Sequence, residues 1–263
     1  MPAPRRGTQG VRAEGYGARV RRRVLVTDAT EFLGPGVVAR FLAEGDEVVD
    51  VAEPLRSRAQ VEALVAQHGP FDVLVANLEA PITVAPVEEH DDATLAELFD
   101  RLVHPLFWLL GACLPPMREQ GAGIVVVPTS ATVLRSSSHP IAGYEAARAA
   151  QAALVRSVAR EVAGDGVRVN GLAPNFIENP SYFPPETVAD PDFQRAVRAE
   201  VPARRLGSAE EAAAVVWWLA SPESSYVHGT VVPTDGAGGS VERPRRTFRP
   251  GGCAAAPGHS GCR

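Results

Sequence analysis

The stretch GIVVVPTSATVLRSSSHPIAGYEAARAA, residues 123–150, runs from a Val-rich segment through a hydroxyl-rich loop into a helix. The apolar run is typical of a parallel strand buried on both faces. Tyr144 and Arg148 stand at i and i+4, so they lie on one helical face. A phenol becomes a useful base near neutral pH only when its phenolate is stabilised, as a fixed cation does. Ser130, Tyr144 and Arg148 therefore form a candidate catalytic set, in which Ser130 contributes a hydroxyl that holds the reacting oxygen.

The rest of the chain repeats this alternation of short apolar strands and helices. Strands are expected at 22–27, 46–51, 71–77, 123–130, 167–175 and 230–239. Helices are expected from about 34, at 57–67, at 94–118 with an interruption at His104-Pro105, at 144–163 and at 209–221. This order predicts an α/β fold with one doubly wound parallel sheet, a Rossmann-like three-layer αβα domain over residues 22–240.

Three further segments lie outside that alternation. Residues 176–206 are Pro-rich and are expected to form a functional cap with a short helix near Phe193. The ends, 1–21 and 241–263, are rich in Arg, Gly and Pro, and are expected to be disordered.

Composition narrows the function classes. The chain has 263 residues and a formal charge of -5, which gives no general attraction to nucleic acid. Binding of nucleic acid by the Arg-rich N-terminal arm remains a minor alternative. Its three cysteines are scattered, so neither a zinc site nor a disulfide framework is expected. No secretory signal or membrane span is evident, and a cytoplasmic location is expected. The sequence contains no lysine.

The first strand-to-helix turn is TDATEFLGPG, residues 27–36. A dinucleotide-binding turn uses glycines so that the backbone can approach the pyrophosphate. Here Asp28 would repel phosphate and the ring of Phe32 would fill the space, which argues against a bound dinucleotide. A divergent but working cofactor loop remains an alternative. Asp50, at the end of the second strand, could bind a ribose, but an exposed strand-end carboxylate is the commoner explanation.

Residues 22–240 resemble the short-chain dehydrogenase/reductase fold. Its signature is a TGxxxGxG turn, an NNAG-like strand end, a Ser, a YxxxK motif and a final DG. This chain has VANLEA at 75–80 in place of NNAG, and YEAAR at 144–148 in place of YxxxK. In those enzymes the lysine binds the nicotinamide ribose as well as tuning the tyrosine, and a chain without lysine cannot supply it.

With an arginine in place of that lysine and an aromatic residue in the first turn, the chain resembles the halohydrin dehalogenases (haloalcohol dehalogenases). These are cofactor-independent relatives with a Thr-x4-Phe/Tyr-x-Gly turn and a Ser…Tyr-xxx-Arg set. Thr27, Phe32 and Gly34 match the first motif. Ser130, Tyr144 and Arg148 match the second. The stretch PNFIENPSYFPPE at 174–186 resembles the family's halide-pocket loop, which gives the candidate halide and substrate residues Pro174, Asn175, Phe176, Ile177, Tyr182 and Phe183.

The resemblance implies conversion of a vicinal halohydrin into an epoxide and halide, with no cofactor and no metal. It also implies the reverse opening of epoxides by azide, cyanide or nitrite. Tyr144 would take the hydroxyl proton while Ser130 holds the oxygen. A homotetramer (dimer of dimers) is expected through the helices at 94–118 and 144–163.

One departure from the family concerns Ser130. Thirteen residues separate Ser130 from Tyr144, where the family usually has twelve. The extra residue either bulges outward or displaces Ser130, with Thr129 and Thr132 as fallback hydroxyls. Two other functions stay open: an atypical NAD(P)-dependent oxidoreductase and a non-catalytic relative.

Overall fold

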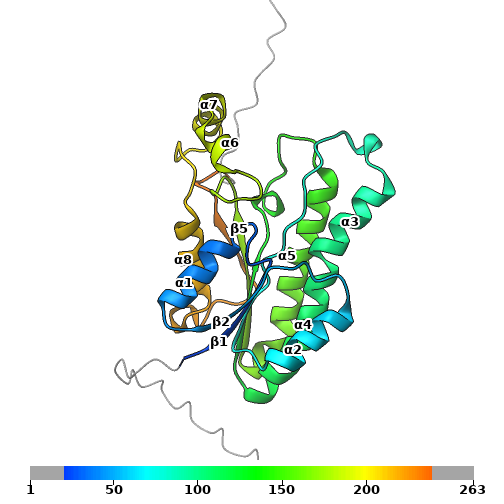
Figure 1. Ribbon diagram of the computed structural model, residues 1–263, viewed down its shortest axis with the longest axis vertical. Coiled ribbons are helices and arrows are strands. Elements are labelled where there is room, and N and C mark those ends of the chain that lie inside the picture. The colour runs from blue at the N-terminus through cyan, green and yellow to red at the C-terminus, as the bar shows by residue number, and fades with distance from the viewer. Residues whose placement is uncertain (1–20, 239–263) are drawn as a thin grey trace, which may run out of the picture.

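The computed structural model describes residues 21–238, where six parallel strands form one sheet in the order β2-β1-β3-β4-β5-β6 (Figure 1). The strands are β1 (Arg23–Thr27), β2 (Glu47–Val51), β3 (Val73–Val75), β4 (Gly123–Pro128), β5 (Val167–Pro174) and β6 (Val231–Thr234). The central strands β3 and β5 are buried throughout, as their continuous apolar runs predict. The predicted doubly wound Rossmann-like sheet is confirmed.

Helices cover both faces of the sheet (Figure 1). One face is covered by α1 (Gly34–Ala43) and α8 (Ala209–Leu219), which share a hydrophobic core with β1 and β3. The other face is covered by α2 (Arg58–His68), α3 (Asp92–Leu102), α4 (His104–Gln120) and α5 (Ala142–Val162). The result is three layers. None of the helices within residues 21–238 has the length and apolar character needed to cross a lipid bilayer.

The interruption expected at His104-Pro105 in the helix at 94–118 is confirmed, because α3 ends at Leu102, α4 begins at His104 and Pro105 stands in the first turn of α4. One detail differs from the sequence-based expectation. The expected cap contains two helices instead of one, α6 (Pro185–Ala189) and α7 (Pro191–Glu200), and the Asp190 side chain caps α7 by accepting from the Asp192 N–H. The predicted disordered arms, Arg21 apart, lie outside the described residues.

The carboxyl ends of the strands position the candidate site. β1 ends at Thr27, β4 at Pro128 and β5 at Pro174, and the loops that follow them meet at one edge of the sheet, below α6 and α7 (Figure 1). Ligands of open α/β sheets bind in the crevice outside the carboxyl ends of the strands. Side chains of the first turn, the Ser130 loop and the Pro174 loop are therefore brought together there.

Candidate active site

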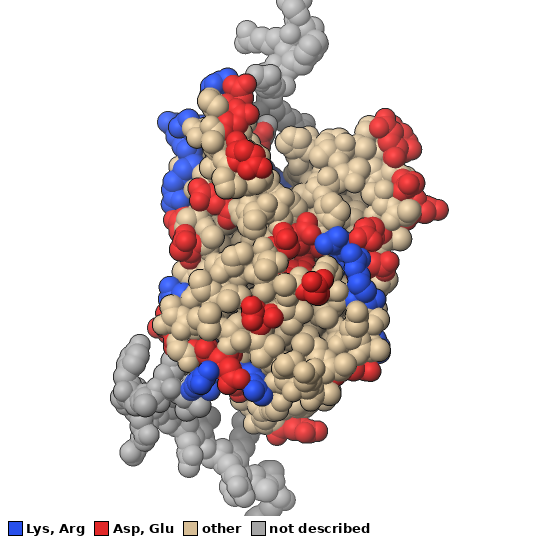
Figure 2. Space-filling model, in the orientation of Figure 1, with Lys and Arg blue, Asp and Glu red and all other residues tan. Residues whose placement is uncertain are grey.

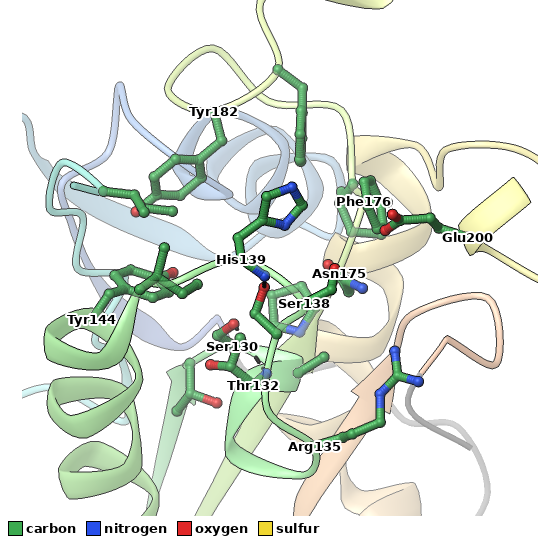
Figure 3. A pocket seen from close by; sticks show the side chains of 18 of the residues that line it. Ser130, Thr132, Arg135, Ser138, His139, Tyr144, Asn175, Phe176, Tyr182 and Glu200 are labelled. Carbon is green, nitrogen blue, oxygen red and sulfur yellow. Dashed lines mark hydrogen bonds between the residues drawn. The ribbon is translucent and has the colours of Figure 1, made fainter. Parts of the chain in front are cut away.

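A cavity of about 630 Å³ opens at this edge, and Figure 2 shows the surface hollowed beside the α6–α7 segment. Ten of the predicted site residues line it: Phe32, Ser130, Thr132, Tyr144, Pro174, Asn175, Phe176, Ile177, Tyr182 and Phe183. Figure 3 shows Ser130 and Tyr144 on the floor of the cavity and Tyr182 and Phe176 above them. Arg148 lies behind Tyr144, fully buried, and does not line the cavity.

Arg148 is held by polar groups in the plane of its guanidinium. Its Nη1 donates to Gln151 Oε1 at 3.0 Å and to the Pro128 carbonyl at 3.3 Å. Gln151 is itself fixed, because its Nε2 donates to the Leu102 carbonyl at 2.8 Å. Gln151 follows Arg148 by three residues on α5, so helical spacing could have identified it as a partner. These bonds fix the cation behind Tyr144.

The guanidinium of Arg148 also lies against two aromatic rings. Its central carbon lies 5.1 Å from the ring centroid of Tyr144 and 5.3 Å from that of Phe32. No carboxylate within residues 21–238 forms an ion pair with it, although the charge of Glu79 acts on it from further away. Burial alone would lower the pKa of Arg148, but the charges of Tyr144 and Tyr182 and hydrogen bonds to both raise it overall. The residue is thus a buried cation whose closest ionisable neighbours are two phenols.

The two phenols are in different environments. Tyr182 Oη donates to the Ala80 carbonyl at 3.0 Å and accepts from Arg148 Nη2 at 3.4 Å. Burial raises the pKa of Tyr182, and the charge of Tyr144 raises it further, so Tyr182 stays neutral. Tyr182 is therefore the phenol held in its neutral form. The sequence placed Tyr182 in the halide loop, whereas the structure places it against Arg148, edge-on to both Phe32 and Tyr144.

Ser130 lies at the floor of the cavity despite the extra residue before Tyr144. Its Oγ accepts a hydrogen bond from the Thr132 N–H at 3.3 Å, and it lines the same cavity as Tyr144. Residues 135–139 of the loop between them line the same cavity. Thr132 Oγ1 is buried and has no hydrogen-bond partner among the described residues. The extra residue therefore leaves Ser130 and Tyr144 on one cavity.

The loop after β5 offers backbone donors. Phe176 has a left-handed backbone with φ of 51°, and its carbonyl accepts from the Gly207 N–H at 2.9 Å. The Asn175 N–H donates to Thr234, whereas the N–H groups of Phe176 and Ile177 have no partner in residues 21–238. Two N–H groups without an acceptor among the described residues, on a loop that lines the cavity with Phe32, suit a small anion.

An aromatic wall continues from this loop into the cap. The ring centroids of Phe176 and Phe183 lie 5.7 Å apart, and those of Phe183 and Phe193 lie 5.4 Å apart. Phe193 comes from α7 and lines the cavity, and sequence reasoning assigned it no site role.

The first turn is closed by the protein itself. The Phe32 N–H donates to Ser181 Oγ at 2.7 Å, and the Leu33 N–H donates to Asn77 Oδ1 at 3.3 Å. Phe32 has φ of 47°, which turns its ring over Arg148. Thr27 and Gly34, expected at the substrate site, do not line the cavity. Thr27 Oγ1 donates to the Asn77 carbonyl, and a Cβ on Gly34 would lie 2.5 Å from the Asp28 carbonyl oxygen, so both support the turn from behind.

Carboxylates lie next to this turn. Asp28 is buried and its Oδ2 accepts from the Glu79 N–H at 2.8 Å, but burial still raises its pKa to about 6. Glu79 pairs with Arg101 at 3.1 Å, and burial raises the pKa of Glu79 as well. Asp50, the alternative ribose ligand, is exposed. Within the described residues no group of three or more His, Cys, Asp or Glu is arranged to hold a metal ion.

Comparison with known proteins identifies the family to which this chain belongs. The family model described as Enoyl-(Acyl carrier protein) reductase matches residues 19–238. The chain belongs to the short-chain dehydrogenase/reductase family.

Its relatives within the family differ in their described activity. The chain is 30% identical to 2-(R)-hydroxypropyl-CoM dehydrogenase of Xanthobacter autotrophicus over 252 residues, which cover 82% of this chain and 98% of that one. A solved structure described as "Dehalogenation enzyme" has a TM-score of 0.76 and 30% identity, covering 82% of this chain and 97% of the other. A halohydrin dehalogenase bound to ethyl (2S)-oxiran-2-ylacetate has a TM-score of 0.74, 24% identity and coverage of 80% and 94%, a likeness of fold alone.

The residues of this short-chain dehydrogenase/reductase do not fit the nicotinamide dinucleotide that the family name implies. A pyrophosphate binds to free N–H groups at a helix N-terminus, and here those of Phe32 and Leu33 already have protein acceptors. The rings of Phe32 and Tyr182 meet edge-to-face, with centroids 5.4 Å apart, beside Arg148. The buried Asp28 carboxylate adds an unfavourable charge. The filled space, the N–H groups that are already bonded and the Asp28 carboxylate all argue against a bound nicotinamide dinucleotide.

Proposed function

We propose that this short-chain dehydrogenase/reductase is a halohydrin dehalogenase that uses no nicotinamide cofactor. The observation that carries the proposal is the environment of Arg148, which is fully buried between the rings of Tyr144 and Phe32 and beside the Tyr182 hydroxyl. A buried cation is costly unless an anion compensates it. Ionised Tyr144 is the neighbour that can do so, and an ionised phenol is the base that ring closure requires.

The reaction follows from this base. Tyr144 takes the proton of the substrate hydroxyl, and Ser130 holds the oxygen by a hydrogen bond. The oxygen then forms a bond to the neighbouring carbon while the carbon–halogen bond breaks, and its electron pair leaves with the halide. Orienting these atoms for backside attack supplies much of the rate.

The leaving halide would be held by the loop after β5. The N–H groups of Phe176 and Ile177 are available, and the ring edge of Phe32 and the amide of Asn175 line the same cavity. Donors placed where charge develops stabilise the transition state. The same site would admit azide, cyanide or nitrite, which open an epoxide in the reverse direction and return the proton from Tyr144.

A second candidate is an NAD(P)-dependent oxidoreductase. The family model and the 30% identity to a dehydrogenase favour it. The closed first turn, the Phe32 and Tyr182 rings and the arginine at position 148 oppose it. The relative described as "Dehalogenation enzyme" supports the first candidate.

Chloride and epoxide release from 1,3-dichloro-2-propanol, measured with no nicotinamide added, separates the two. We expect equal amounts of both products from the wild type and none from Tyr144→Phe, because phenylalanine keeps the ring and removes the base. Fluorescence titration with NADH and NADPH should show no binding. Cofactor-dependent carbonyl reduction without halide release would establish the oxidoreductase instead.

We also propose that the enzyme is a homotetramer assembled through α3, α4 and α5. Phe107 on α4 is 56% exposed and Leu95 on α3 is 43% exposed, so a partner subunit on this side would remove apolar surface from water. Sedimentation of the full chain tests this, and a monomer at assay concentration would contradict it.

A further inference from the structure

His139 is an ionisable side chain at the cavity mouth that the reaction above does not use. It lines the same cavity as Ser130 and Tyr144. Figure 3 shows its imidazole turned into the cavity, in the gap between Tyr182 and Phe176. Neither ring nitrogen has a hydrogen-bond or ion-pair partner among residues 21–238. Both ring nitrogens are therefore available for hydrogen bonds with water.

The backbone that carries His139 is held in place. Its N–H donates to Ser137 Oγ at 3.0 Å, and the Ser137 N–H donates to Glu145 Oε1 at 2.5 Å. Pro140 follows, which restricts the backbone of His139, and the Pro140 carbonyl accepts from the Ala85 N–H at 3.0 Å. Since Glu145 is next to Tyr144 on α5, the loop is anchored to the helix that carries the proposed base.

The proposed reaction leaves a proton that has to be removed. Each ring closure puts the substrate's hydroxyl proton on Tyr144, whose side chain is only 5% exposed. Arg148 behind it is already fully protonated. Tyr182 cannot accept the proton either, because burial raises its pKa and its own O–H is bonded to Ala80. The proton therefore leaves through the cavity.

The other ionisable groups that line the cavity are poorly suited to receive it. Arg135, from the same loop as His139, stays protonated. Glu200 of α7 lies beyond Phe176, across the cavity from Tyr144 (Figure 3). In Figure 3 His139 lies between Tyr144 and Glu200. Imidazole is the side chain that exchanges protons near neutral pH.

We propose that His139 relays the proton between Tyr144 and bulk water in both directions of the reaction. In ring closure the Tyr144 hydroxyl proton passes through cavity water to one imidazole nitrogen, and the other nitrogen releases a proton to the solvent. In epoxide opening the same steps run in reverse. A cavity of about 630 Å³ has room for the connecting water. This inference rests on the proposed dehalogenase function.

The test compares His139→Gln with the wild type in weakly buffered solution. Leu134→Gln is the matched control, because Leu134 belongs to the same loop, is 47% exposed and does not line the cavity. Stopped-flow measurements follow epoxide formation and, with a pH indicator, proton release during the first turnover. We expect H139Q to form the first epoxide at the wild-type rate but to release its proton late, with kcat lowered at least about tenfold. Added imidazole buffer should restore kcat, and L134Q should match the wild type.

Each outcome decides between the alternatives. Proton release from H139Q at the wild-type rate would overturn the relay and leave the dehalogenase standing. Slow epoxide formation that imidazole does not restore would make His139 a substrate contact, which also overturns the relay. A wild-type enzyme that forms no epoxide would remove the proposed function itself. Circular dichroism of H139Q checks the fold, which an exposed side chain should not affect.

Discussion

Replacing Arg148 by methionine tests the link between the buried cation and the base. The change removes the charge and keeps a long side chain. The guanidinium carbon lies 5.1 Å from the centroid of the Tyr144 ring. At an effective dielectric constant of about 20, unit charges at that separation attract by about 3 kcal/mol. Since about 1.4 kcal/mol changes a rate tenfold, we expect kcat for chloride release to fall by about two orders of magnitude at neutral pH.

The assay includes Arg148→Lys and a range of pH. Lysine keeps the charge but cannot reproduce the bonds to Gln151 and Pro128 together, so its loss should be smaller than that of R148M. The rate of R148M should rise by about tenfold per pH unit, because a higher hydroxide concentration offsets the missing charge. Thermal unfolding of both variants separates loss of catalysis from loss of fold.

A folded R148M protein with the wild-type rate and pH profile would refute the reasoning. The charge would then have no part in activating Tyr144, and Arg148 would be a packing residue. A rate that falls equally in R148M and R148K, with no dependence on pH, would point to misplacement of the tyrosine instead.

Three further predictions concern the residues around this cation. Burial raises the pKa of Asp28 from 3.8 to about 6, so ionising it disfavours the folded state: the contribution of Asp28 to stability should be fully present below about pH 4 and fall by about 3 kcal/mol as the pH rises through 6. Urea unfolding should show this slope in the wild type and not in Asp28→Asn. Tyr182→Phe should lower the free energy of unfolding by about 1–3 kcal/mol, because a buried carbonyl loses its donor, and should reduce kcat less than R148M does, as paired unfolding and chloride-release measurements would show. Phe32→Ala opens space beside Arg148 but leaves the N–H groups of the turn bonded, so NADPH should still not bind in a fluorescence titration.

The fold was predictable because its signal is local. Apolar runs mark the strands, and Tyr144 and Arg148 share a helical face by spacing alone. The motif positions of Phe32 and Ser130 were also readable, and the structure places both on the cavity. Such inferences need only the period of one element and the rule that site loops follow the carboxyl ends of strands.

What escaped prediction depends on contacts between loops distant in sequence. The hydrogen bond between Arg148 and Tyr182 joins residues 34 positions apart in the sequence. The hydrogen bond from the Phe32 N–H to Ser181 joins residues 149 positions apart. The burial of Asp28 results from the packing of residue 79 against the turn, and the direction of His139 is set by Glu145 and Pro140. No periodicity in the chain encodes these contacts. They depend on how the loops pack against one another at the carboxyl edge of the sheet.

The arginine at position 148 and the filled cofactor space are physically linked. The Arg148 guanidinium donates to Gln151, Pro128 and Tyr182 and lies against the rings of Phe32 and Tyr144. A lysine ammonium at this position could not reproduce this set of contacts. On the proposed function, Phe32 and Tyr182 both complete the shell of the cation and fill space that a nicotinamide cofactor would need. Arg148→Lys alone would leave a buried ammonium with too few hydrogen-bond acceptors. Removing the Phe32 ring alone would leave a cavity beside the cation. A return to nicotinamide chemistry would require changing all three positions and freeing the N–H groups of the first turn together.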